Sequence, residues 1–306
     1  MRSTMDLDST YGAMYIGIMV ATFFQGILTL QSYVYYETYR KDSWKLKALV
    51  AVVWSIDFIH LIFIGKAGYH YFITNWGNVD SLAMSVWEFD AHPILIGVAT
   101  ILSQAFFLWR LYRFSGQNVF LLLFLTAICL VPFVFNVYIA VQSIKVNYLT
   151  PAGLADQWGK HEIQSLRPEA INLFVWGATS DVLIASILCY YLHQEKSDYE
   201  KTNSLIDRVI RYTVTTGLAT SVFAVACLVT YFIRPESFIF VSMHFSLGRM
   251  YTNNLIAALN YRHQLRGINN RCNACLESVS IQFTSTTNGT SNILNTEKDG
   301  TLPFFL

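Results

Sequence analysis

Three ionisable residues stand alone in long apolar stretches of this sequence. Each is the only Asp, Glu, Lys or Arg of its stretch: Asp57 in Ala48–Gly65, Asp181 in Ala170–Gln194 and Arg249 in Phe238–Tyr261. A charge at the centre of a membrane helix costs at least about 2.5 kcal/mol, so such groups face the protein interior and pair. The fork of an arginine can bond two carboxylates and does not lose its proton. We therefore predict that Arg249 is held by Asp57, Asp181 or both.

Two histidines lie close to these charges along the chain. His60 follows Asp57 by three residues and shares its helix face, and His244 precedes Arg249 by five. We predict a polar site for a small molecule or an ion, made by Asp57, His60, Asp181, His244 and Arg249. Further polar residues that could line it are Gln104, Thr216, Ser221 and Asn253. The competing interpretation is structural, because buried ion pairs also fix a fold without any ligand.

Catalytic and metal sites have weaker support in the sequence. Asp57 and His60 supply two metal ligands, with a third only if His244 approaches, so we predict no metal and no cofactor. No Gly-x-Ser-x-Gly, His-Glu-x-x-His or phosphate-binding glycine loop occurs. Residues 238–261 contain no lysine that could form a retinal Schiff base. An enzyme is therefore not favoured, and a metal enzyme at these three residues stays an alternative hypothesis.

The three charges belong to a set of seven stretches long enough to cross a bilayer. The other four carry no charge at all: Thr10–Tyr36, Ala91–Trp109, Phe114–Ile144 and Tyr212–Ile233. A helix needs roughly 20 mainly apolar residues to span the hydrocarbon core. Charged residues make up only 13% of the chain, about half the share of a soluble domain. We predict an all-α integral membrane bundle of seven transmembrane helices (13–262), with an outer segment (1–12) and a largely disordered cytosolic tail (263–306).

The positions of Lys and Arg predict the orientation of this bundle. Fourteen lie on the side that holds loop 194–211 and the tail, against six on the side of the N-terminus. Cytosolic loops carry the excess, so the N-terminus is predicted outside and the C-terminus in the cytosol. The protein would reside in the plasma membrane or an endomembrane, with the lipid bilayer and an unknown small molecule as partners. A cytosolic partner would bind the tail and loop 194–211, whose second half is predicted to continue the sixth helix.

The cysteines and the net charge support two smaller predictions. Cys272 and Cys275 follow the last helix in the predicted cytosolic tail, which makes them candidate palmitoylation sites. This single Cys-x-x-Cys pair supplies too few ligands for structural zinc. The net charge of +1 gives no electrostatic support for binding to nucleic acid.

Five segments of the chain are similar to those of a known family. They are Trp54-Ser-Ile-Asp-Phe-Ile-His60, Tyr69-His-Tyr-Phe-Ile-Thr-Asn-Trp-Gly-Asn78, Ser180-Asp-Val-Leu-Ile-Ala-Ser-Ile-Leu-Cys-Tyr-Tyr-Leu-His193, Thr202-Asn-Ser-Leu-Ile-Asp-Arg-Val-Ile-Arg211 and Leu247-Gly-Arg-Met-Tyr-Thr-Asn-Asn-Leu-Ile-Ala-Ala-Leu-Asn260. With them the chain resembles, over about Gly12–Arg262, a fungal and mainly basidiomycete family of seven-helix membrane proteins without assigned function. The resemblance implies a multi-pass topology and supplies no activity, ligand or catalytic residue. In that family's pattern a basic residue, often lysine, stands at Arg249, and asparagine is common where this chain has Asp207.

Four functional hypotheses follow. The first is a receptor-like protein that binds a small molecule from the outer face and signals through loop 194–211 and the tail. The second is a proton-coupled transporter in which a protonated aspartate releases Arg249. The third is the metal enzyme, and the fourth is a scaffold without ligand. The third stretch ends in Trp109-Arg-Leu-Tyr-Arg113 and the seventh lacks Asn-Pro-x-x-Tyr, so any likeness to G-protein-coupled receptors is one of topology alone.

Overall fold

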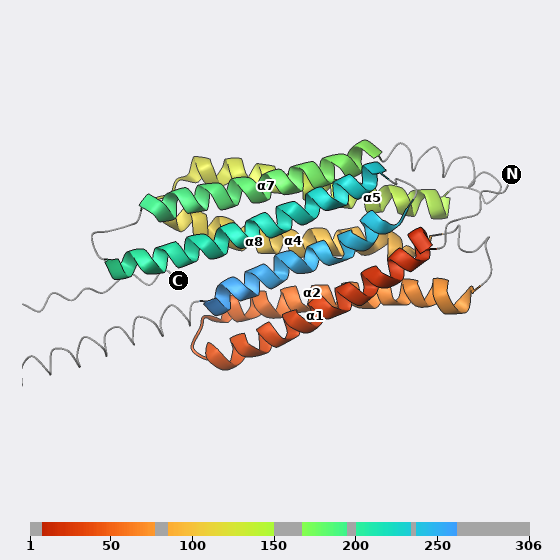
Figure 1. Cartoon of the computed structure of the whole chain (residues 1–306), viewed down its shortest axis with the longest axis horizontal. Helices are drawn as coiled ribbons and strands as arrows, with labels where there is room; N and C mark the ends of the chain where they lie inside the picture. The colour runs from red at the N-terminus through yellow and green to blue at the C-terminus, as the bar shows by residue number, and fades with distance from the viewer. Residues whose placement is uncertain (1–7, 77–84, 150–166, 195–199, 234–236, 262–306) are drawn as a thin grey trace, which may run out of the picture.

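The computed structural model describes residues 8–76, 85–149, 167–194, 200–233 and 237–261. Within these ranges the chain is helical apart from short turns, and no strand occurs. The long helices are α1 (Ala13–Thr38), α2 (Trp44–Tyr69), α4 (Trp87–Phe114), α5 (Val119–Leu149), α7 (Arg167–Gln194), α8 (Glu200–Ile233) and an unlabelled helix at 239–261, drawn blue in Figure 1. The prediction of an all-α protein is confirmed for this part of the chain.

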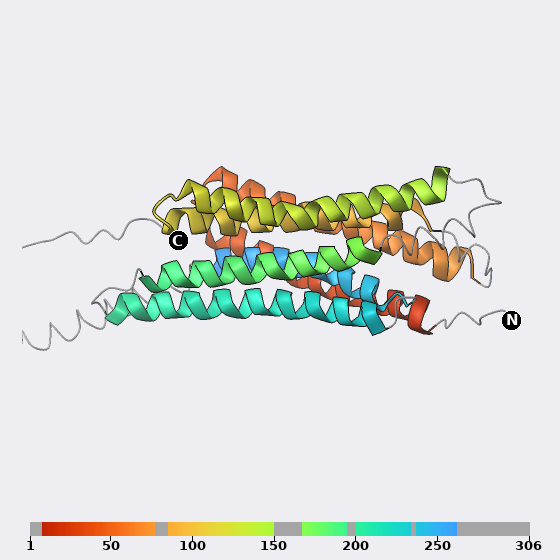
Figure 2. The same ribbon diagram turned by 90° about the horizontal axis from the view of Figure 1, so that it is seen from above.

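The helices lie side by side along one long axis and form an elongated bundle (Figures 1 and 2). Consecutive helices pack as pairs, α1 with α2, α4 with α5 and α7 with α8, and α5 also packs on α7. Helix 239–261 lies between α8 and the α1–α2 pair in Figure 1. Helix 239–261 therefore contacts helices from both ends of the sequence.

Six helices are long and apolar enough to cross a membrane: α1, α2, α4, α5, α7 and α8. Their outward faces carry large apolar side chains, including Phe23, Phe120 and Val222, which are 67%, 86% and 67% exposed. Apolar side chains of this size on so many outward faces are suited to lipid, because a soluble bundle turns polar residues outward. The protein is a multi-pass membrane protein by length and composition of these helices.

Helix 239–261 differs from the other six and is not among the membrane-crossing candidates. Polar residues lower its hydropathy, among them His244, Arg249, Asn253 and Asn254. None of its residues is exposed, and Arg249 is 0% accessible. A helix without a face exposed to lipid can carry polar groups that a lipid-facing helix cannot. The sequence predicted a seventh span at this place; the structure has a polar helix here, the central helix, which lies outside the six candidates.

Close backbone approach holds the central helix against α1 and α4. A Cβ atom added at Gly17 of α1 would lie 2.6 Å from the Cβ of Ser242. One added at Gly248 would lie 3.1 Å from the Cγ2 of Ile96 on α4. Small residues at such crossings let membrane helices pack tightly. These contacts fix the rotation of helix 239–261 and so the direction in which Arg249 points.

Residues 66–90 separate the predicted stretches Ala48–Gly65 and Ala91–Trp109 and so were expected to form a long outer loop, but this segment is largely helical where it is described. α2 runs to Tyr69 and a π-helical turn, η2 (His70–Thr74), continues it, while α4 already begins at Trp87. The prediction failed because it ended helices at charged residues. Here Lys66 forms an ion pair of 2.5 Å with buried Glu88, which joins the ends of α2 and α4.

Two helix starts lie near predicted boundaries. A π-helical turn, η1 (Asp8–Gly12), within the predicted outer segment leads into α1, which starts at Ala13. α8 begins at Glu200, so the second half of loop 194–211 continues the sixth helix as predicted. The tail 263–306, with Cys272 and Cys275, lies outside the described residues.

Candidate functional site

Arg249 is the centre of a buried contact between helix 239–261 and α2. Its Nη1 donates to the carbonyl oxygen of Phe245 at 2.7 Å and contacts Nδ1 of His60 at 2.9 Å. Its Nη2 donates to the backbone carbonyl oxygen of Asp57 at 3.2 Å. Neither the Asp57 nor the Asp181 carboxylate forms an ion pair with this guanidinium. Arg249 is thus buried beside Asp57 as predicted, but the predicted carboxylate pairing is wrong.

The carboxylate of Asp57 bonds to the central helix through another residue. Its Oδ2 accepts a hydrogen bond of 2.5 Å from the hydroxyl of Thr252, and both residues are buried. Thr252 follows Arg249 by three residues and so lies on the same helix face. The guanidinium and the carboxylate still interact through space. Asp57 therefore joins α2 to helix 239–261 twice, through its carboxylate and through its backbone.

Asp181 belongs to a separate polar centre on α7. Its Oδ2 accepts a hydrogen bond of 2.8 Å from the hydroxyl of Tyr251. Thr220 of α8 and Gln104 of α4 also interact with this carboxylate. Tyr251 precedes Thr252 by one residue and points about 100° away around the helix, because 3.6 residues make a turn. The single cluster predicted from the sequence is therefore divided into two centres on different faces of helix 239–261.

Three buried histidines form a row across α2, α4 and helix 239–261. The ring centroids of His60 and His92 lie 5.8 Å apart, and those of His92 and His244 also lie 5.8 Å apart. Phe245 packs edge-on against His60 and His92, at 6.2 Å and 5.1 Å between ring centroids. The row is thus closed in by aromatic side chains and lies directly beside Arg249.

The hydrogen bonds determine which nitrogen of each imidazole carries the proton. Arginine has donors only, so Nδ1 of His60 accepts from Arg249 and the proton of neutral His60 is on Nε2. Nδ1 of His92 contacts the carbonyl oxygen of Phe89, which only accepts, so neutral His92 has its proton on Nδ1. Both Nε2 atoms are buried and have no partner. His60 thus offers an unused donor and His92 an unused acceptor.

The remaining polar residues expected at this site have mostly local partners. Ser221 donates to the carbonyl oxygen of Gly217 within its own helix. Asn253 donates to the carbonyl oxygens of Arg249 and Phe24, which ties helix 239–261 to α1. Gln104 lies with Asp181, and the side chain of Thr216 is outside the described part. In that part, no three His, Cys, Asp or Glu side chains are placed to hold a metal ion.

Sequence reasoning missed His92, Tyr251 and Thr252. His92 lies at the start of the stretch Ala91–Trp109 and was not considered for the site, although Glu88 and His92 have the i, i+4 spacing of one helix face. Both are buried, at 5% exposure each. Tyr251 and Thr252 were read as part of an ordinary apolar helix. Only their position next to Arg249 could have drawn attention to them.

Comparison with known proteins matches one part of the chain to a family of unknown function. Residues 177–264 match the model of DUF6534, a family of unknown function. The matched segment contains α8, most of α7 and helix 239–261, and so includes Asp181, His244 and Arg249. No curated protein and no solved structure matches the chain.

Proposed function

We propose that this membrane protein is a receptor-like sensor that binds a small, neutral, hydrogen-bonding molecule between α2, α4 and helix 239–261. The observation that carries the proposal is the pair of complementary unpartnered nitrogens on His60 and His92. A buried polar group without a partner costs roughly 1–3 kcal/mol. A hydroxyl group placed between the rings would accept from His60 and donate to His92, and so relieve both costs.

The contacts of Arg249 support this position for the ligand. The guanidinium holds His60 by its Nδ1, which fixes both the ring orientation and the proton on Nε2. The Nε of Arg249 is itself buried and without a partner, and adds a third polar atom to the same region. Compared with the site predicted from sequence, the proposed site keeps Asp57, His60, His244 and Arg249 and replaces Asp181 with His92.

The same proposal gives helix 239–261 the role of a seventh span. Its 23 residues are roughly 34 Å long at 1.5 Å per residue, enough for about 30 Å of hydrocarbon. With seven spans and the distribution of Lys and Arg, the N-terminus would be outside and the tail in the cytosol. A ligand that moves the central helix would act on α8, because Thr230 of α8 contacts the sulfur of Met243. The output would then reach loop 194–211.

A ligand screen with a matched pair of histidine variants tests the proposal. The purified protein in lipid nanodiscs is screened by thermal unfolding against neutral alcohols, amides and sugars. The His92→Phe variant keeps the ring shape and removes the acceptor, while His193→Phe changes an exposed histidine at the end of α7. Compounds that raise the melting temperature of the parent and of His193→Phe, but not of His92→Phe, support the site. A screen in which every stabilising compound acts equally on His92→Phe contradicts it.

A proton-coupled transporter is the second candidate, and one contact favours it. The Asp57 carboxylate bonds to Thr252 and lies beside Arg249 without pairing to it, so its protonation would alter the α2 contact while Arg249 stays bound to the backbone. In this case Asp57→Asn would abolish pH-dependent uptake in proteoliposomes. Uptake that keeps its pH dependence in Asp57→Asn would remove this candidate.

A scaffold without ligand makes the opposite prediction for the same residues. An ordered water molecule could satisfy His60 and His92 as well as a ligand does. Replacing His60 and His92 together by phenylalanine would then leave both the fold and the cellular phenotype intact. A loss of phenotype in a variant that still folds would exclude the scaffold.

A further inference from the structure

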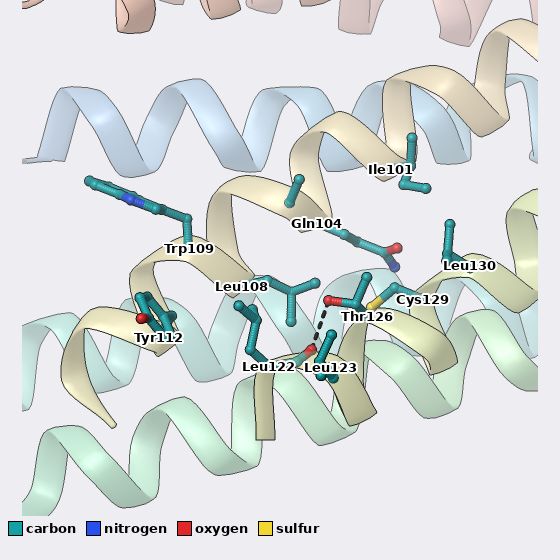
Figure 3. Close-up of a pocket in the computed structure, with 11 residues that line it drawn as sticks. Ile101, Gln104, Leu108, Trp109, Tyr112, Leu122, Leu123, Thr126, Cys129 and Leu130 are labelled. Carbon is teal, nitrogen blue, oxygen red and sulfur yellow. Dashed lines mark hydrogen bonds between the residues drawn. The ribbon is translucent and has the colours of Figure 1, made fainter. Parts of the chain in front are cut away.

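A second feature lies away from the histidine row, on the side of the bundle formed by α4 and α5. It is a crevice of 290 Å³ between the C-terminal half of α4 and the N-terminal half of α5 (Figure 3). Its walls are mainly apolar, with Ile101 and Leu108 on α4 and Leu122 and Leu130 on α5. A concave apolar site with a few polar groups is the usual form of a small-molecule site.

The crevice opens sideways, toward the lipid. Ala105, Trp109 and Leu123 line it and are exposed on the outward faces of α4 and α5. Both helices belong to the six that are suited to cross a membrane. A molecule would therefore enter from the bilayer, which restricts the occupant to lipid-soluble compounds.

The floor of the crevice contains one buried amide whose orientation is fixed. The Nε2 of Gln104 donates to the hydroxyl oxygen of Ser180 at 3.1 Å. That hydroxyl must accept, because its own proton is donated to the carbonyl oxygen of Gly177. The amide therefore turns its NH₂ group toward α7, and its Oε1 is left buried without a partner. In Figure 3 the side chain of Gln104 extends toward Thr126, Cys129 and Leu130.

The second polar group at this level is also an acceptor. The hydroxyl of Thr126 donates to the carbonyl oxygen of Leu122 at 2.7 Å, so its oxygen has only lone pairs to offer. Because Gln104 and Thr126 both offer acceptors here, a ligand that bonds to them must carry a hydrogen-bond donor. An ether or a hydrocarbon has none, and an ionised carboxylate supplies none and is costly to bury.

The depth and size of the crevice exclude an ordinary membrane lipid as the donor. Gln104 is ten residues from the end of α4 at Phe114, roughly 15 Å along the helix axis. A lipid anchored by its head group places its hydroxyls at the interface and only hydrocarbon at this depth. The volume of 290 Å³ corresponds to roughly ten water-sized groups at about 30 Å³ each. The occupant is therefore a small free molecule that enters whole.

We propose that this crevice binds an uncharged aliphatic alcohol of about ten non-hydrogen atoms, which donates its O–H to Oε1 of Gln104. The hydrocarbon chain lies along Leu108 and Leu122 toward Trp109. The site is independent of the histidine row and goes beyond the sensor function proposed above. It identifies a lipid-accessible ligand site of defined chemistry in the α4–α5 pair.

Competition photolabelling in nanodiscs tests this proposal. The full-length protein is labelled with a diazirine-bearing nine-carbon alcohol, and labelled peptides are mapped by mass spectrometry. Competitors are 1-nonanol and 1-methoxyoctane, which have equal numbers of non-hydrogen atoms and differ in the donor, compared at equal membrane concentration. One neutral hydrogen bond contributes about 0.5–1.5 kcal/mol, which is roughly a twofold to tenfold difference in affinity. We expect label within residues 101–130, displaced at lower concentration by 1-nonanol than by the ether by that factor.

Variants at Gln104 and Ala105 test the role of the amide and the role of the cavity separately. Gln104→Leu should remove the preference for the alcohol over the ether. Ala105→Trp fills the opening without touching the core and should reduce the labelling of residues 101–130 at least fivefold, whereas Ala51→Trp, at an exposed position on α2, should not. If Gln104→Leu fails to fold, the comparison of Ala105→Trp with Ala51→Trp still tests whether the alcohol binds in this crevice. Labelling spread evenly over the lipid-facing surface, equal displacement by alcohol and ether, or undiminished labelling in Ala105→Trp would each overturn the proposal.

Discussion

The contact between Thr252 and the Asp57 carboxylate gives the sharpest stability prediction. The hydroxyl of Thr252 lies 2.5 Å from Oδ2 of Asp57, and neither residue is accessible to solvent by more than 3%. Valine has nearly the same shape as threonine and lacks the hydroxyl. Thr252→Val therefore removes one hydrogen bond from a buried carboxylate and leaves the packing almost unchanged.

The magnitude follows from the charge and burial of the acceptor. A hydrogen bond to a charged group contributes about 1.5–3 kcal/mol. Without the Thr252 hydroxyl, the Asp57 carboxylate stays buried away from water that could replace this bond. The other acceptors of the hydroxyl, the carbonyl oxygens of Arg249 and Gly248, lie at 3.1 Å and 3.4 Å in its own helix. Such bonds within a helix contribute little. We expect Thr252→Val to lower the free energy of unfolding by about 2 kcal/mol.

The assay is reversible unfolding in mixed micelles, with a matched control. Thr179→Val is the same substitution at an exposed position of α7, where the hydroxyl bonds only to the carbonyl oxygen of Val175. Its effect should stay below about 0.5 kcal/mol. A double-mutant cycle with Asp57→Asn should give a coupling of at least about 1 kcal/mol. If Thr252→Val costs no more than Thr179→Val, the α2 contact described above is not made.

Three further substitutions are measured in the same unfolding assay. Arg249→Lys should lower the free energy of unfolding by about 2 kcal/mol, because one ammonium cannot reach both carbonyl oxygens and His60 as the guanidinium does. The control Arg211→Lys, at an exposed site, should have almost no effect, and equal effects of the two would contradict this role of the guanidinium. Tyr251→Phe removes the donor to Asp181 and should cost about 1–2 kcal/mol; a neutral result would mean that Thr220 and Gln104 suffice. Gly17→Val places a Cβ 2.6 Å from that of Ser242 and should lower the free energy of unfolding by about 1–3 kcal/mol. In the control Gly26→Val the added Cβ meets nothing within 4 Å. An equal loss of stability in both variants would contradict the close approach at Gly17.

The sequence predicted which charges are buried, but not what they bond to. Isolated charges in apolar helices must face the interior, so burial of Asp57, Asp181 and Arg249 could be predicted from composition alone. Their partners depend on helix rotation and neighbour order, which a sequence pattern does not contain. α7 reaches the other face of helix 239–261, so Asp181 bonds Tyr251 and cannot reach Arg249. Helix rotation also explains why Arg249 bonds to the backbone carbonyl oxygen of Asp57 rather than to its carboxylate.

The helix boundaries and the central helix were predicted less well, for a related reason. Ending helices at charged residues left Glu88 outside the predicted helix, whereas in the structure it lies in α4 and the ion pair with Lys66 satisfies it at the end of the bundle. Periodicity could have corrected this error, since Glu88 and His92 share one helix face. The polar content of helix 239–261 was read as a few exceptions in an apolar span. In the structure this helix has no fully exposed residue, and its polar side chains are buried or half-buried against neighbouring helices.

The central claim is that His60 and His92 are neighbouring neutral imidazoles of opposite tautomer, one with an unused donor and the other with an unused acceptor. Nitrogen-15 solid-state NMR of histidine-labelled protein in lipid measures this directly, because protonated and unprotonated ring nitrogens have well-separated chemical shifts. His60→Phe and His92→Phe variants assign the signals. We predict the proton on Nε2 in His60 and on Nδ1 in His92. The same tautomer in both rings, or a charged imidazolium in either, would contradict the account.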